Sequence, residues 1–435
     1  SSCKAHAGIW GAATPQMPAF GVRGLDMPCC RRTHSVCPLP QVSGRIRVAR
    51  GLQHGCMTSQ DTSAPRAPLV GIRVIDFSTL LPGPMCSLLL AQAGAQVIKI
   101  ERPGRGDEMR AYMPKFGEDS VNFALLNQGK RSVALDLKEP AALQQAIALV
   151  RQADVLVEQF RPGVMDRLGL GYEAMRAINP GLIYCAITGW GQHGPLADMA
   201  AHDLNYQAET GLMALTAGAD GAPGLPNVLA ADLVGGAYPA IMNILLALRA
   251  RDASGLGAFI DVAMADNLFP LVYWGLGNGF AAGEWPTPGG DLVTGGTPRY
   301  QVYRTRDGRY LAVAPLEDKF WENFLRVLEA PQLRDDAADP IGTREAVAAI
   351  IASRSADEWL QRFANVDACV SVVKSLQEAV ETPHFRERGL FQARITSRDG
   401  RQIPSLPLPI APAFRQGAES SAPALGESTP ASLAR

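Results

Sequence analysis

Three side chains of this sequence stand where they could carry acid–base or nucleophilic chemistry. His202 lies at the start of an expected helix, Asp232 follows 30 residues later beside a Gly-Gly pair that opens another helix, and Glu317 ends an expected strand. Imidazole and carboxylate groups transfer protons near neutral pH, and a carboxylate can also attack a carbonyl as a nucleophile. Each also has a plain structural reading: a helix N-cap for Asp232, a packed side chain for His202 and a solvated acid for Glu317.

Strand and helix patterns alternate through the region that would position these groups. Apolar strand patterns occur at residues 71–77, 95–100, 132–136, 154–158, 181–188 and 258–263, and helical patterns at 85–93, 141–153 and 229–251. Strands that alternate with helices are typical of parallel pairing with crossover connections. The sequence therefore predicts an α/β fold, with a doubly wound parallel-sheet large domain over residues 67–270.

The pattern changes after this domain. Residues 271–298 are rich in Gly and Pro and are expected to be a linker. Residues 299–380 predict a smaller α+β domain, with a hairpin of residues 300–304 and 310–314 around the turn dipeptide Asp307-Gly308, then helices from Phe320 and Arg344. Residues 381–435 are expected to return to the large domain and to end as a surface tail.

Residues 1–66 are expected to be an unstructured or non-native N-terminal segment. Residues 1–56 hold seven Lys and Arg against one acid, Asp26, without a sustained apolar period. This composition permits a transit peptide, but the Pro and Gly content and the lack of an amphipathic helix favour an appended or upstream segment, with Met57 as an alternative start. We expect a cytoplasmic protein, or a mitochondrial one if residues 1–56 are a transit peptide.

Composition and missing motifs narrow the function. The 41 Lys and Arg are balanced by 42 Asp and Glu. The chain therefore has no excess of positive charge that would favour a nucleic-acid partner. The sequence has no run of about 18 apolar residues, so it predicts no membrane-spanning helix. No Gly-rich dinucleotide fingerprint, P-loop, zinc-protease motif or nucleophile elbow is present. Cysteines are widely spaced outside residues 1–56 and lack paired Cys-x-x-Cys spacing, so we expect reduced thiols and no metal.

Seven runs in order resemble one known family. They are GIRVID at 71–76, IERP at 100–103, KRSVALDLK at 130–138, EQFRPG at 158–163, GWGQHGP at 189–195, HDLNY at 202–206 and ADLVGG at 231–236. With these runs the chain resembles the type III CoA-transferase family, which includes formyl-CoA transferase, carnitine CoA-transferase and α-methylacyl-CoA racemase. The resemblance covers residues 70–433 and implies an interlocked homodimer.

The resemblance implies roles for the three reactive side chains. Asp232 matches the carboxylate that forms acyl and CoA intermediates in transferases and acts as an acid/base on the α-carbon in racemases. His202 matches the second acid/base of the racemase branch, and many transferases lack it. Glu317 matches a racemase glutamate that holds this histidine across the dimer, although Asp318 adjoins it.

The resemblance also implies a CoA site. Arg102, Lys138 and Arg167 match positions that contact the phosphates, and guanidinium groups suit phosphate oxygens. Leu80 matches a residue that lines the adenine end. The backbone amides at Asp203 would face the thioester oxygen. Met213, Met264 and Trp274 are candidates to line the acyl tail, with core packing as their alternative role.

The sequence leaves two enzyme functions and one binding function open. The first is an α-methylacyl-CoA racemase-like enzyme that uses 1,1-proton transfer at the α-carbon, with no metal or redox cofactor and no cofactor beyond the CoA of its substrate. The second is a CoA-transferase that forms an aspartyl-CoA thioester on Asp232. A run of three or four glycines that closes over the intermediate in several transferases is reduced here to Gly289-Gly290 and Gly295-Gly296. A non-catalytic CoA-binding or dimer-interaction protein is the third. The acyl group, and any second acid substrate, stay undefined.

Overall fold

The computed structural model describes residues 67–216, 218, 221–417 and 419–433, and the statements below concern these residues. The segment predicted to be unstructured or non-native, residues 1–66, lies outside them.

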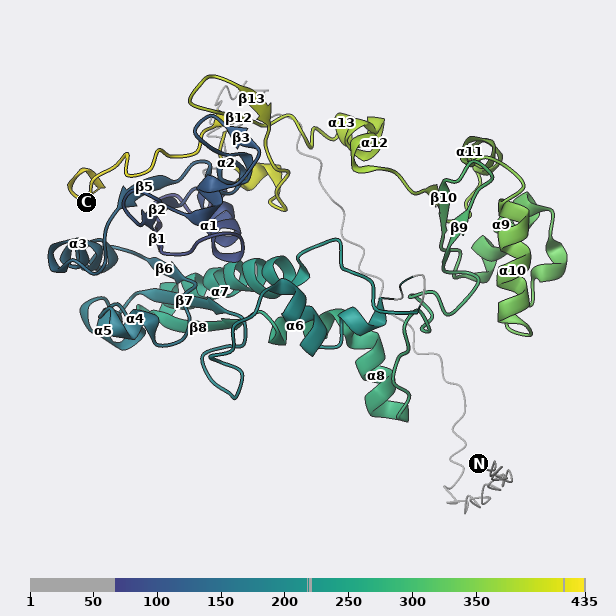
Figure 1. Cartoon of the computed structure of the whole chain (residues 1–435), viewed down its shortest axis with the longest axis horizontal. Helices are drawn as coiled ribbons and strands as arrows, with labels where there is room; N and C mark the ends of the chain where they lie inside the picture. Colours follow the sequence, from purple (N-terminus) through teal and green to yellow (C-terminus); the bar gives the residue numbers. More distant parts are fainter. Residues whose placement is uncertain (1–66, 217, 219–220, 418, 434–435) are drawn as a thin grey trace, which may run out of the picture. The chain divides into compact units, whose positions relative to one another are not determined.

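Six parallel strands form the main sheet, in the order β5-β2-β1-β6-β7-β8, as Figure 1 shows. Their bounds are Arg73–Asp76 (β1), Gln96–Glu101 (β2), Arg131–Ala134 (β5), Val155–Glu158 (β6), Ile183–Thr188 (β7) and Ala258–Ala263 (β8). In the register of the sheet, Val74 of β1 is level with Val97 of β2 and Val155 of β6. The strand order reverses between β1 and β6. The predicted doubly wound α/β sheet is confirmed.

Helices cover both faces of this sheet (Figure 1). Their bounds are Pro82–Gln92 (α1), Val121–Asn127 (α2), Pro140–Arg151 (α3), Val164–Arg167 (α4), Tyr172–Ile178 (α5), Asp203–Glu209 (α6) and Tyr238–Ser254 (α7). Helices α1 and α7 share a buried cluster with one face, and α3, α4 and α5 share another with the opposite face. Helix α1 begins earlier than the predicted residue 85, because proline is favourable in the first helical turn.

Helix α7 continues a π-helical segment, Ala231–Ala237, so that Ala231–Ser254 forms one long apolar stretch. By length and composition it is the one helix among the described residues that could cross a membrane, whereas the sequence pattern predicted none. Its Ala240, Ile244 and Leu248 are buried against the sheet. One face of the helix therefore packs against the sheet, while other apolar side chains of the helix stay exposed.

The predicted linker is partly helical. Helix α8 (Tyr273–Ala282) runs through it. Gly275 and Gly279 lie on this helix where a Cβ would be 2.6 Å from the side chains of Pro286 and Trp285. The glycines that indicated a break in the pattern instead allow the following segment to pack closely on the helix.

Residues 301–372 form a separate core around Trp321 and Trp359. Its antiparallel sheet has the order β11-β10-β9, and Gly308, at φ +80°, lies in the predicted turn between β9 and β10. The bounds are Gln301–Arg304 (β9), Tyr310–Val313 (β10), Val370–Val372 (β11), Asp318–Leu328 (α9), Pro340–Ile351 (α10) and Ala356–Phe363 (α11). The predicted hairpin and helices are confirmed.

Helices α12 (Leu376–Glu381) and α13 (Pro383–Glu387) follow the small core. The chain after them packs on the large domain with strands β12 (Arg394–Thr396), β13 (Gln402–Pro404) and β14 (Glu419–Ser420). Within the large domain, Lys115–Phe116 (β3) pairs with Asp119–Ser120 (β4). Ile395 is buried beside Phe116. The amide of Ser428 donates to the Ser132 carbonyl oxygen at 3.0 Å. The predicted surface tail therefore also covers the edge of strand β5.

Candidate active site

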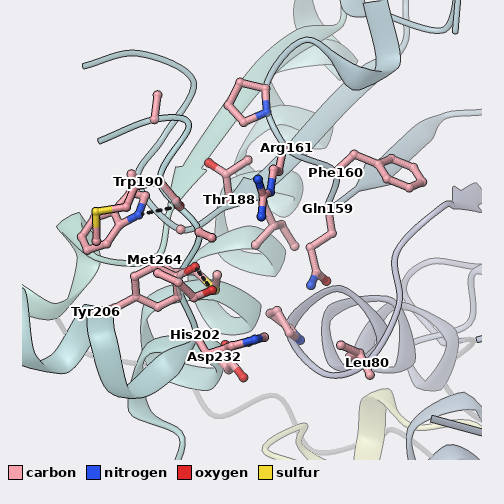
Figure 2. Close-up of a pocket in the computed structure, with 18 residues that line it drawn as sticks. Leu80, Gln159, Phe160, Arg161, Thr188, Trp190, His202, Tyr206, Asp232 and Met264 are labelled. Atoms are coloured by element: carbon pink, nitrogen blue, oxygen red, sulfur yellow. Dashed lines mark hydrogen bonds between the residues drawn. The ribbon is translucent and has the colours of Figure 1, made fainter. Parts of the chain in front are cut away.

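A pocket opens at the carboxyl ends of the parallel strands, where the strand order reverses. Its walls come from the segments after β1, β6, β7 and β8, together with α6 and the π-helical segment (Figure 2). The 18 lining residues are Leu80, Pro82, Gln159, Phe160, Arg161, Pro162, Ile187, Thr188, Gly189, Trp190, Ala197, Met199, Ala200, Ala201, His202, Tyr206, Asp232 and Met264. In doubly wound sheets this is the place where ligands bind.

Asp232 lies in the first turn of the π-helical segment and is half-buried in the pocket wall. π-helical turns are frequent at functional sites. The segment lies close to the chain after β8, since a Cβ on Gly235 would be 2.2 Å from the Met264 carbonyl oxygen. Burial first, and then the charge of Asp203, raise the pKa of Asp232 from 3.8 to about 6. This carboxyl group is thus suited to exchange protons near neutral pH.

Asp203 holds the segment that carries Asp232. Its Oδ1 accepts hydrogen bonds from the amides of Ala231 at 2.7 Å and Asp232 at 3.0 Å, and its Oδ2 accepts from Gln207 at 2.6 Å. Asp203 is buried and does not line the pocket. Its carboxylate caps a helix from another part of the chain. The predicted contact of its backbone amide with a thioester stays a prediction.

His202 is the N-cap residue of helix α6, and its ring is available to the pocket. The His202 amide donates to Asn205 Oδ1 at 3.0 Å, and the Asn205 amide donates back to the His202 carbonyl oxygen at 2.8 Å. These reciprocal bonds use the backbone of His202, and the residue is exposed. Figure 2 shows His202 and Asp232 among the residues that line the same pocket. The structure therefore brings the two predicted proton carriers together.

Aromatic and apolar side chains complete one wall. Trp190 and Tyr206 meet edge to face, with ring centroids 4.9 Å apart, and the Tyr206 hydroxyl donates to the Ala201 carbonyl oxygen at 3.0 Å. Of the three residues predicted to line an acyl tail, Met264 lines the pocket, whereas Met213 and Trp274 do not. The wall is therefore apolar beside the two reactive groups.

The predicted CoA-binding residues lie at the same edge of the sheet but not all in the pocket. Leu80 lines it. Arg102 follows β2, Lys138 follows β5 and Arg167 ends α4, and all three are exposed outside the pocket lining. Their contact with phosphates stays a prediction.

Glu317 does not line the pocket of its own chain. It is the exposed N-cap residue of helix α9, next to Asp318, whose carboxylate pairs with Arg299 at 2.7 Å. The Asp318 side chain is thus engaged locally. Glu317, by contrast, forms no ion pair with any of the described residues. Its predicted contact with His202 is not made within one chain.

Residues 159–161 were not assigned a role from the sequence, although they lie in one of the seven matching runs. Gln159 Oε1 accepts from the Gly83 amide at 3.0 Å. The Arg161 side chain makes no hydrogen bond or ion pair to the described part of the chain, and Thr188 Oγ1 is buried without a partner there. Figure 2 shows both side chains in the pocket. Arg161 is exposed, so its guanidinium is available to a ligand, whereas the Thr188 hydroxyl is buried in the pocket wall.

Glu158 precedes this run at the end of strand β6. Burial raises its pKa to about 8, against the lowering effect of a 2.7 Å hydrogen bond from the Phe160 amide. Burial therefore favours the neutral form of the Glu158 side chain. Among the described residues, no group of three or more His, Cys, Asp and Glu is placed to hold a metal ion.

Comparisons with known proteins find relatives that cover most of the chain. The chain is 35% identical to human α-methylacyl-CoA racemase over 371 residues, which is 83% of this chain and 91% of the relative. It is 34% identical to acetyl-CoA:oxalate CoA-transferase of Acetobacter aceti over 364 residues, 81% of this chain and 92% of the relative. A CAIB/BAIF family protein from Brucella suis has a similar structure, with a TM-score of 0.72 and 30% identity over 83% of this chain and 97% of that one.

The relatives therefore include both racemases and CoA-transferases. The family model of CoA-transferase family III matches residues 69–429. This match spans the large sheet, the pocket with His202 and Asp232, and the small α+β core. The chain therefore belongs to CoA-transferase family III, a family of enzymes.

Proposed function

We propose that this protein is an α-methylacyl-CoA racemase-like enzyme that moves the α-proton of a 2-methylacyl-CoA thioester. The observation that carries the proposal is the presence of both His202 and Asp232 in one pocket. Racemisation through a planar enolate requires two proton carriers, one for each face, whereas a transferase requires one nucleophile.

In the proposed reaction one carrier removes the α-proton and leaves an enolate, and the other carrier returns a proton to the opposite face. The pKa of about 6 for Asp232 keeps its two protonation states close in energy near neutral pH. The exposed Arg161 guanidinium in the pocket lining would donate hydrogen bonds to the enolate oxygen. Arg102, Lys138 and Arg167 would hold the phosphates of CoA, and Leu80 would contact its adenine end.

A CoA-transferase is the second candidate, and its support is the half-buried Asp232 carboxylate together with the transferase relatives. Asp232 would attack the thioester carbonyl and release CoA thiolate, which leaves an acyl-aspartyl anhydride. The thiolate would then attack the aspartyl carbonyl, release the first acid and form the aspartyl-CoA thioester. A second acid would take CoA through the reverse steps.

Trapping with hydroxylamine separates the two reactions. A racemase-like enzyme in deuterated water should place deuterium at the α-carbon of 2-methylacyl-CoA while the Asp232 peptide keeps its mass after hydroxylamine treatment. A transferase intermediate would instead be converted to an aspartyl hydroxamate. Peptide and substrate masses measure both outcomes, and the Asp232→Asn protein is the control for labelling elsewhere. An acyl-dependent hydroxamate on Asp232 in good yield would make the CoA-transferase the first candidate and the racemase-like enzyme the second.

We further propose that the protein works as an interlocked homodimer in which Glu317 of the partner subunit orients His202. Two observations support it. The pocket lacks Glu317 of its own chain, and helix α7 exposes Met242 and Leu246 by 55% and 61%. Exposed apolar side chains on a core helix are typical of subunit interfaces. A carboxylate partner fixes the imidazole tautomer and raises its basicity.

Complementation tests this shared site. Asp232→Asn and Glu317→Gln should each inactivate a homodimer, but a purified mixed dimer should recover about half of the wild-type activity, because one of its two sites is intact. Co-expression with two different tags gives the mixed dimer. Wild-type-like activity of the Glu317→Gln homodimer, or an inactive mixed dimer, would contradict the proposal.

A further inference from the structure

Leu80 lines the pocket with its backbone in the left-handed region, at φ +63°. A branched side chain without glycine's freedom is costly in this conformation, so surrounding contacts must impose it. Leu80 lies in the connection between strand β1 and helix α1, two residues before Pro82, which also lines the pocket.

The contact that reaches Leu80 comes from Asp107. The Leu80 amide donates to Asp107 Oδ1 at 3.2 Å, and the Met109 amide donates to the same oxygen at 2.9 Å. The other oxygen, Oδ2, forms an ion pair with Lys99 Nζ at 2.9 Å, and both side chains have no solvent exposure. The Asp107 amide itself donates to Glu101 at 2.9 Å.

Lys99 holds the same connection at a second point. Its Nζ donates to the Ser78 carbonyl oxygen at 2.6 Å. A second buried carboxylate, Asp76, accepts from the Ser78 amide at 2.9 Å and from Ser87 Oγ at 2.6 Å, with Lys130 Nζ 3.4 Å away. The connection is therefore fixed at Ser78 and at Leu80 by groups that water does not reach.

The connection also touches the segment that carries Asp232. A Cβ on Gly236 would be 3.1 Å from Pro82 Cβ, so the Pro82 side chain lies close to the backbone of Gly236. A buried ion pair contributes little net stability compared with a packed apolar pair. Its directional bonds to Ser78 and Leu80, by contrast, define one backbone geometry at the edge of the pocket.

We propose that the buried Lys99–Asp107 ion pair is a positioning device of the ligand pocket, which holds Leu80 in its left-handed conformation and thereby sets the wall that receives CoA. The inference rests on the proposed function, because it takes CoA as the ligand of this pocket. Neither Lys99 nor Asp107 lines the pocket, so both act through Leu80.

Asp107→Asn tests this role, because it keeps the shape and one acceptor but removes the charge that pairs with Lys99. We expect the Kd for CoA and the KM for acyl-CoA to rise about 10-fold, while kcat changes less than about 3-fold. Leu80→Gly in the Asp107→Asn background should restore CoA affinity to the level of Leu80→Gly alone, because glycine adopts the left-handed conformation without a Cβ penalty. Alone, Leu80→Gly should cost only the lost side-chain contact.

The matched control is Asn365→Gly, at another left-handed residue with φ +61° that does not line the pocket. In the same Asp107→Asn background it should not restore CoA affinity. If Asp107→Asn does not fold, Asp107→Glu displaces the bonded oxygen while keeping the charge. The same loss and the same rescue are then expected.

Calorimetry with CoA and thermal unfolding of each variant give the result. Unchanged CoA affinity in a folded Asp107 variant, or failure of Leu80→Gly to restore it, would overturn the positioning role. A wild-type protein that does not bind CoA would instead overturn the proposed function, so the two failures are distinct.

Discussion

His202→Ala is expected to lower the removal of the α-proton from one enantiomer of 2-methylacyl-CoA by about 10²–10⁴-fold, with a much smaller effect on the other. The substitution removes the proton carrier on one face of the substrate and leaves Asp232 on the other face. Both residues line the same pocket, and the backbone bonds that cap helix α6 do not require the imidazole. The helix should therefore remain in place.

The measurement is deuterium incorporation from deuterated water into each pure enantiomer, followed by mass. His193→Ala is the matched control, because His193 is exposed in the preceding loop and does not line the pocket. Equal losses for the two enantiomers, with CoA transfer intact, would contradict the racemase-like reaction.

Asp232→Asn is expected to remove activity and to stabilise the fold at the same time. Proton exchange and any CoA transfer should both fall by at least about 10³-fold, since either reaction requires this carboxylate. The folded protein holds Asp232 with a pKa of about 6 instead of 3.8. Between about pH 3.8 and pH 6 the folded protein is left with a buried negative charge beside Asp203, so this group contributes less stability as pH rises through that range, and the loss is complete above it.

Asparagine has no charge to bury, so the melting temperature should rise by about 5 °C at pH 8 and by about half as much at pH 5. Asp252→Asn, at an exposed position of helix α7 that forms a 3.7 Å ion pair with Arg249, is the control and should leave activity unchanged. A gain that is equal at both pH values would argue against a raised pKa. Residual activity above about a tenth would argue against the catalytic role.

The sequence predicted most of the large domain because each of its elements has a local signal. Strand β8 was predicted with the bounds that the structure has, and the Asp307-Gly308 turn gave the hairpin of the small core. Helix α8 was not predicted, because its glycines are typical of a break in secondary structure. Glycine is needed at these positions because Trp285 and Pro286 approach the helix closely, and the local sequence pattern does not reveal this contact.

The candidate site, like the fold, was predicted only in part. Motif resemblance nominated His202, Asp232 and Leu80, and the structure places all three in the pocket lining. It did not assign Arg161 or Thr188, although both belong to or adjoin matching runs. A sequence motif does not show which side chains come together in the folded protein.

By itself the sequence determined the alternating strands and helices and the two reactive groups at helix starts, because apolar period, turn residues and helix-start residues act over a few positions. The tertiary structure decided what these groups face. The order of the strands brings the segments after β1, β6, β7 and β8 to one edge, and Asp203, from 29 residues away, caps the turn of Asp232. Burial and that neighbouring charge then raise the pKa of Asp232, because desolvation and electrostatic repulsion depend on distance in space and not on separation along the chain.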